Sequence, residues 1–142
     1  MKVSRYNPEG YCDPTAYAAL SHIEEQRIAG KPVHRIVYIC SPYAGDVEYN
    51  VRKAQAYCRF AVESDCVPIA THLLFPQFMD DTDPGERQQA LLMSGLLLSK
   101  CNEVWVFGEK VSSGMLSEIR KATAHNKPVR YFTTDCQEVK VS

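Results

Sequence analysis

The stretch RIVYICSPYAGD, residues 35–46, decides the fold, because a buried strand passes there through a tight turn into a helix. Its first half is β-branched, aromatic and almost entirely apolar, which favours a strand covered on both faces. Its second half consists of turn-forming residues. From the helix-capping Asp46 onward, apolar residues recur at helical spacing through residue 64. A strand, a turn and a helix in this order form the repeating unit of a parallel α/β sheet.

The same alternation continues along the chain. Further strands are expected at 66–70, 103–107 and 128–132, and further helices at 84–100 and 114–125. Residues 71–83 are interpreted as a long loop with room for one helical turn. We therefore expect an α/β three-layer sandwich of the flavodoxin or Rossmann type, with a parallel sheet of four to five strands between layers of helices.

The beginning of the chain predicts one more helix. Asp13 is a suitable cap, Pro14 suits a first helical turn, and a loose apolar stripe follows as far as residue 28. We expect residues 1–34 to form an N-terminal helical extension and residues 35–142 to form a single α/β domain.

The composition excludes several classes of protein. Of the 142 residues, 45% are hydrophobic and 23% are charged, as in one compact domain. The net charge is −1 with both signs mixed, so nucleic acid is not an expected partner. No apolar run approaches the roughly 20 residues that span a bilayer, so no membrane partner is expected. The six cysteines include no CxxC pair and residues 1–13 are polar, which indicates a cytoplasmic location. No residues have metal-ligand spacing, and we expect neither a metal nor a cofactor.

Ligands of such sheets bind beyond the carboxyl ends of the strands, so the loops there should surround the site. Gly45 permits a tight turn whose following amides can hold a phosphate or ribose oxygen, and Tyr43 can stack on a base. His72 is expected only to line the site. Asp46 caps its helix whatever else it does. The predicted substrate-binding residues are Ser41, Pro42, Tyr43, Gly45, Asp46, His72, Phe75, Asp80, Gly108, Ser112, Ser113, Gly114 and Met115.

Glu118 is the residue on which the functional interpretation depends. At 100° per residue its helix turns Met115 and Ala122 inward, and Glu118 lies between them on the edge of that stripe. A carboxylate there loses hydration unless it lines a cavity or has a partner. One interpretation is a carboxylate that attacks a substrate, or stabilises positive charge, in a cleft. The other is a glutamate that complements the start of its helix or pairs with a neighbouring loop.

Several motifs together resemble a known superfamily. YICSPYAGD, PIATH, CNEVWVFG, SSGMLSEIRKA and NKPVRYF, all within residues 36–132, are similar to sequences of the nucleoside 2-deoxyribosyltransferase-like superfamily. The closer resemblance is to an uncharacterised branch, a domain of unknown function found in Firmicutes and their phages. The resemblance implies that Glu118 attacks the anomeric carbon of a nucleoside or nucleotide, releases the base and forms a covalent glycosyl intermediate.

The resemblance leaves two functions open. Relatives carry aspartates at the positions of Ser94, Asn102 and Ser112, so the acid that protonates the base would have to be Asp80, Asp81 or Glu109. The first function is an N-glycosidase or a nucleoside (deoxy)ribosyltransferase. The second is a non-catalytic module, linked to phages, that binds or sequesters a nucleotide or an ADP-ribose derivative. The resemblance also implies a homo-oligomer, a dimer or larger, because relatives complete their pocket with a neighbouring subunit.

Overall fold

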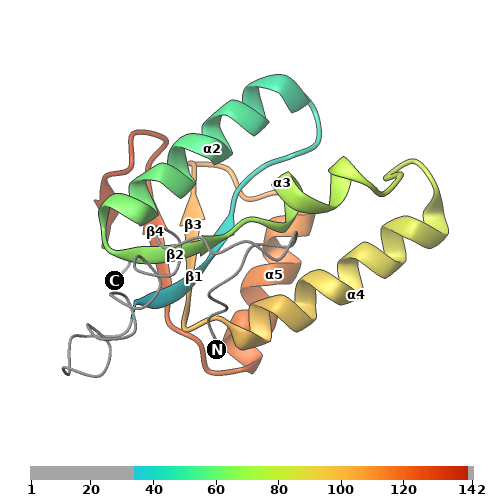
Figure 1. The fold of residues 1–142 in the computed structure, drawn as a ribbon. Coiled ribbons are helices and arrows are strands. Elements are labelled where there is room, and N and C mark those ends of the chain that lie inside the picture. The colour runs from blue at the N-terminus through green and yellow to red at the C-terminus, as the bar shows by residue number, and fades with distance from the viewer. Residues whose placement is uncertain (1–33, 141–142) are drawn as a thin grey trace, which may run out of the picture. The chain divides into compact units, whose positions relative to one another are not determined.

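The computed structural model describes residues 34–140, so the expected N-terminal helical extension lies almost wholly outside the described residues. Within them is a five-stranded sheet with the strand order β2-β1-β3-β4-β5 (Figure 1). The strands are β1 (Arg35–Cys40), β2 (Cys66–Ile69), β3 (Glu103–Phe107), β4 (Val129–Phe132) and β5 (Glu138–Val139). Because β1 to β4 pair in parallel, the expected α/β fold is confirmed.

Helices cover both faces of this sheet (Figure 1). They are α2 (Val47–Glu63), α3 (Thr71–Leu74), the 3₁₀ turn η1 (Phe75–Gln77), α4 (Pro84–Lys100) and α5 (Ser113–Ala124). The predicted bounds agree with these to within one residue, and α3 with η1 provides the helical turn in the long loop. No helix between residues 34 and 140 combines the length and apolar character needed to cross a bilayer.

Alternate residues of the central strands supply two separate cores. In β1, Val37 and Ile39 pack beneath α2, whereas Tyr38 and Cys40 belong to the core beneath α4 and α5. All four side chains are completely buried. A strand turns successive side chains to opposite faces, so Tyr38 and Cys40 point toward the helix that carries Glu118.

The edge strand β5 was not expected, and it corrects the prediction of a wholly parallel sheet because it pairs antiparallel with β4. A tight turn brings the chain back, with Thr133 N donating to Gln137 O at 2.9 Å. The Arg130 guanidinium then donates to both carboxylate oxygens of Glu138, at 2.7 and 2.9 Å. A strand of two residues is too short for its periodicity to be recognised in the sequence.

Side-chain caps fix where the helices begin at the carboxyl edge of the sheet. Asp46, Asp83 and Ser112 each accept a hydrogen bond from a backbone amide in the first turn of α2, α4 and α5, respectively. Such caps satisfy amides that have no partner within the helix. Since α2 follows β1 and α5 follows β3, both helices start at the edge where the rule for parallel sheets places a ligand.

Candidate active site

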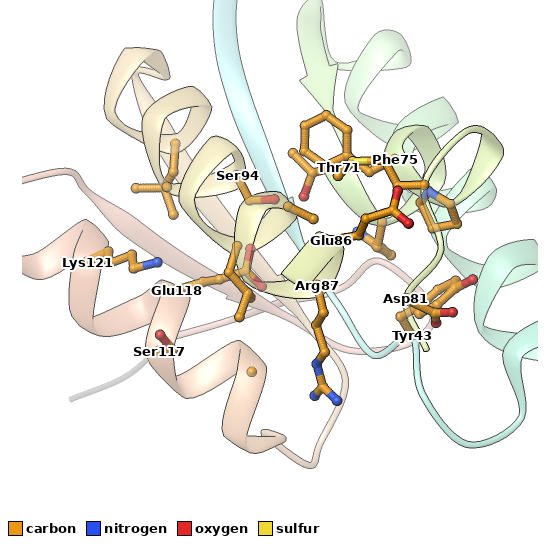
Figure 2. A pocket seen from close by; sticks show the side chains of 18 of the residues that line it. Tyr43, Thr71, Phe75, Asp81, Glu86, Arg87, Ser94, Ser117, Glu118 and Lys121 are labelled. Carbon is orange, nitrogen blue, oxygen red and sulfur yellow. The ribbon is translucent and has the colours of Figure 1, made fainter. Parts of the chain in front are cut away.

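A pocket of about 200 Å³ lies at this edge, lined by residues of α3, η1, α4 and α5 (Figure 2). The loop after β1 contributes Tyr43 to its wall. Of the residues predicted for the site, the lining includes Tyr43, His72, Phe75, Asp80, Gly114 and Glu118. The structure therefore gathers side chains from the segments that follow β1, β2 and β3.

Glu118 faces this pocket from α5 and is partly buried. Burial raises the pKa of its carboxyl from the ordinary 4.5 to about 7, although the Tyr38 hydroxyl, Lys121 and the Cys40 thiol favour the charged form. Between residues 34 and 140, no cationic side chain forms an ion pair with it. Pairing with a neighbouring loop is therefore not observed, and the carboxylate borders open space.

Uncharged groups of β1 lie behind Glu118. The Cys40 thiol is 3.9 Å from Glu118 Oε1 and donates toward the Met115 carbonyl at 3.7 Å. Burial raises the pKa of this thiol well above its ordinary value, so it stays protonated. A 2.9 Å hydrogen bond joins the Tyr38 hydroxyl to Thr71 Oγ1, and burial also raises the pKa of that phenol. The sheet thus surrounds the inner side of the carboxylate with neutral donors and apolar atoms.

His72 contributes a neutral ring to the pocket. A 2.8 Å hydrogen bond joins its Nε2 to Oγ of Ser41, which is itself buried. Burial lowers the pKa of His72 to about 4, so the imidazole carries no charge near neutral pH. Ser41 therefore orients a lining residue and does not line the pocket itself.

Carboxylates gather on the side of the pocket formed by the loop before α4. Asp80, Asp81 and Glu86 all belong to the lining. Thr82 donates to Asp80 Oδ1 from its amide at 2.9 Å and from its hydroxyl at 2.6 Å. These bonds hold the pKa of Asp80 below its usual range. The Asp80 amide in turn donates to Glu86 Oε1 at 3.5 Å, so this loop is tied to the start of α4.

Several predicted substrate-binding residues have a structural place outside the lining. Gly45 and Gly108 adopt φ values of +97° and +104°, the left-handed region that glycine tolerates best. Met115 is 2% exposed and belongs to the core beneath α4 and α5, which corrects its expected contact with substrate. The others outside the lining are Pro42, Asp46, Ser112 and Ser113, of which Asp46 and Ser112 are helix caps.

The α4 wall of the pocket was missed by sequence reasoning. It includes Arg87, Leu91, Ser94 and Gly95, and α5 adds Lys121. The apolar residues of α4 are spread around its whole circumference, so the sequence does not show which face of the helix lines the pocket. Of these residues, the resemblance points only to Ser94.

Asn102 and Ser94, at which the resemblance implies an aspartate, lie in different surroundings. Asn102 precedes β3 at the amino edge of the sheet, where its side-chain oxygen accepts from Ile36 N at 2.7 Å. It is not part of the pocket lining. Ser94 does line the pocket, so of these two residues Ser94 alone belongs to the candidate site.

Within residues 34–140, no group of three or more His, Cys, Asp or Glu side chains is arranged to hold a metal ion. The lining of the pocket offers carboxylates, hydroxyls, a neutral imidazole and two cationic side chains.

Comparisons with other proteins agree with this architecture. Residues 35–132 match the model of a family described as a domain of unknown function, DUF7768. No curated protein matches the sequence. Among solved structures, the chain is similar to a 2-deoxyribosyltransferase from the psychrotolerant bacterium Bacillus psychrosaccharolyticus, with a TM-score of 0.58 and 13% identity over 75% of this chain and 77% of that one. At this identity the likeness shows the fold alone, a nucleoside deoxyribosyltransferase-like α/β fold.

Proposed function

The chain belongs to the DUF7768 family, and we propose that it is an enzyme that cleaves or exchanges the N-glycosidic bond of a nucleoside or nucleotide. The observation that supports this proposal best is Glu118 itself. Its carboxyl group borders a pocket on one side and neutral groups of the sheet on the other, without an ion pair among the described residues. A buried carboxylate without an ion pair is suited to a substrate that develops positive charge at its anomeric carbon.

The proposed reaction has two displacements at the anomeric carbon. Glu118 Oε attacks this carbon and forms a glycosyl ester as the bond to the base nitrogen breaks. The base leaves with the bonding electron pair and takes a proton from water or from a carboxyl group of the pocket. Water then attacks the same anomeric carbon in hydrolysis, or a second base does so in exchange, and the bond to the Glu118 oxygen breaks. The incoming nucleophile loses a proton, and Glu118 departs as a carboxylate.

The surroundings of Glu118 support differential stabilisation of the transition state. In the free protein the charged carboxylate is disfavoured, because burial raises its pKa to about 7. Positive charge on the sugar ring would compensate for that unfavourable burial only as the glycosidic bond breaks. Neutral donors behind the carboxylate orient it without neutralising it.

Base release from a panel of nucleosides and nucleotides tests the proposal. The wild type should release base from at least one compound, and Glu118→Gln should lower kcat by at least about 10³-fold, as for other residues whose contact exists mainly in the transition state. Glu63→Gln is a matched control, since Glu63 is exposed at the end of α2 and lies outside the lining. If Glu118→Gln and the wild type released base equally fast, or neither released any, the proposal of catalysis would be wrong.

A second candidate function is a binding module that sequesters a nucleotide or ADP-ribose-type signal without changing it. The observation in its favour is Asp80, whose hydrogen bonds from Thr82 keep the carboxylate ionised and thus unable to donate a proton near neutral pH. Ligand recovered chemically unchanged from a denatured tight complex would support this function. Recovery of free base and sugar would support the enzyme.

We also propose that the protein is a homo-oligomer. Leu92 and Leu96 on α4 are 66% and 61% exposed, which is high for leucines one turn apart on a helix. A second copy of the chain is the partner proposed for this surface. Light scattering after size exclusion should give at least twice the mass of one chain. The mass of a single chain would contradict this.

A further inference from the structure

Polar residues lie on both sides of Glu118 in the pocket, and the second cation of the lining, Arg87, lies between Glu118 and Asp81 (Figure 2). Figure 2 shows Lys121 and Ser117 to one side of Glu118, and Asp81 and Tyr43 to the other. Three groups that can donate hydrogen bonds lie on the α4 and α5 side, and we name them the donor group: Ser94, Ser117 and Lys121. Three carboxylates lie toward the loop before α4, and we name them the acidic loop: Asp80, Asp81 and Glu86.

Lys121 reaches the pocket wall because a glycine on the neighbouring helix leaves space for its side chain. Its Nζ, Cδ and Cε lie 3.2, 3.6 and 3.7 Å from the point where a Cβ on Gly95 would stand. The lysine side chain therefore crosses α4 at the position where no side chain is present, and it is partly buried there. Among residues 34–140, no carboxylate forms an ion pair with its ammonium. In the described part of the chain, the ammonium therefore lies in the pocket wall without an ion pair, and its charge favours the ionised form of Glu118.

The two serines of the donor group are also without partners. Helical serine and threonine hydroxyls commonly donate to a carbonyl of the preceding turn. Ser99 and Thr123 do so here, to Leu96 O at 2.6 Å and Ile119 O at 3.0 Å. In contrast, no hydrogen bond of the Ser94 or Ser117 side chain is found within the described residues. Both hydroxyls are therefore available to a ligand in the pocket.

We propose that the donor group binds the phosphate of a nucleoside monophosphate, so that the substrate of the reaction proposed above is a nucleotide and not a free nucleoside. An ammonium and two hydroxyls match the charge and the acceptor oxygens of a phosphate monoester. This inference rests on the proposed function for the position of the sugar, which must place its anomeric carbon at Glu118.

The acidic loop fixes the direction in which such a ligand binds. Its carboxylates repel a phosphate, and one of them, Glu86, directly precedes Arg87, the other cation of the lining. We therefore place the phosphate at Lys121, at the α5 end, and the base toward Tyr43 and Phe75. Aromatic side chains there can stack on the base. Carboxylates beside it can accept hydrogen bonds from a base that carries N–H donors, which adenine, guanine and cytosine present on their exocyclic amines.

Calorimetric titration tests the inference in the Glu118→Gln protein, which should bind ligands without turning them over. The probes are adenosine, guanosine, cytidine, their deoxy forms, and the 5′-monophosphate of each. For at least one base, the monophosphate should bind at least about tenfold more tightly than its nucleoside, as expected of one charge-assisted hydrogen-bonding site. Equal affinities, or no binding of either form, would overturn the inference.

Lys121→Met in the same protein should reduce this preference to within about twofold, because a thioether keeps the apolar stem and removes the charge. Arg120→Met is the matched control, since Arg120 is the exposed neighbour on α5 and lies outside the pocket. The double change Ser94→Ala with Ser117→Ala removes the hydroxyls without adding bulk and should also reduce the preference. A preference that survived both sets of changes would contradict the inference.

Base release by the wild type separates this inference from the proposed function. Lys121-dependent binding of a monophosphate without base release would support the phosphate site and contradict the proposed enzymatic activity. If base release from nucleosides were as efficient as from their monophosphates, the proposed enzymatic activity would be supported and the phosphate site contradicted.

Discussion

The Cys40 thiol lies 3.9 Å from Oε1 of Glu118, so strand β1 and helix α5 meet directly behind the candidate nucleophile. The thiol stays protonated because burial raises its pKa, and it therefore offers the carboxylate a weak donor and no charge. The opposite side of Glu118 borders the pocket. This one-sided burial explains why the pKa of Glu118 is raised to about 7.

The burial of Glu118 predicts a specific dependence of stability on pH. Because its pKa in the folded protein is about 7 and its ordinary value is 4.5, the folded state binds a proton that the unfolded chain lacks between these values. The free energy of unfolding should therefore fall by up to about 3 kcal/mol as the pH rises through this window. Glu118→Gln removes the effect, and urea unfolding should show it to be the more stable protein at about pH 8. A stability difference between the two proteins that did not change with pH would contradict this.

The same raised pKa predicts the pH profile of catalysis. Only the ionised carboxylate attacks, so kcat/KM should rise about tenfold per pH unit toward about 7 and then level off. His72, whose pKa is lowered to about 4, should add no step between about pH 5 and 8. Initial rates of base release across this range check the prediction. A rate that fell as the pH rose through 7 would instead assign Glu118 the role of a proton donor.

Gly95→Ala should separate stability from ligand preference. The new methyl group meets the tip of Lys121 at 3.2 Å, and the end of a flexible side chain can move. Alanine in place of a glycine inside α4 should raise the free energy of unfolding by about 0.5 to 1 kcal/mol. The displaced ammonium should at the same time weaken the preference for monophosphates. A clear decrease in the free energy of unfolding would contradict this, because it would show that the Lys121 side chain cannot move away from the new methyl group.

Asn102→Ala should affect stability alone. The Asn102 side chain accepts a 2.7 Å hydrogen bond from Ile36 N at the amino edge of the sheet, outside the pocket lining. Its loss should lower the free energy of unfolding by about 1 kcal/mol. Under conditions in which both proteins are fully folded, ligand affinity and base release should stay at wild-type levels. A selective loss of either would place Asn102 in the active site after all.

The local sequence was enough to predict strands β1 to β4 and helices α2, α4 and α5, because each of these has its own signal. Met115 and Ala122 are both buried, as the helical spacing predicts. Because Glu118 lies between them on the same stripe, the spacing was also enough to predict that its side chain faces the interior. Tyr43 and His72 were predicted from their places after β1 and β2, since parallel strands end at one edge.

The donor group could not be predicted in the same way. Lys121 appears in the sequence as a solvent-facing lysine, and only the packing of α5 against α4 reveals that Gly95 makes room for it. In α4, leucines occur on every side, so the pattern did not distinguish the pocket face that carries Ser94 from the exposed face that carries Leu92. Contacts between helices that are distant in sequence decide these assignments.

The most direct measurement is the intact mass of the protein after rapid acid quenching during turnover of a nucleotide that it cleaves. The wild type should carry one added pentosyl phosphate group, located by peptide fragmentation on Glu118, and Glu118→Gln should carry none. Base release without any such adduct, or with an adduct on another residue, would contradict the central claim that Glu118 is the nucleophile.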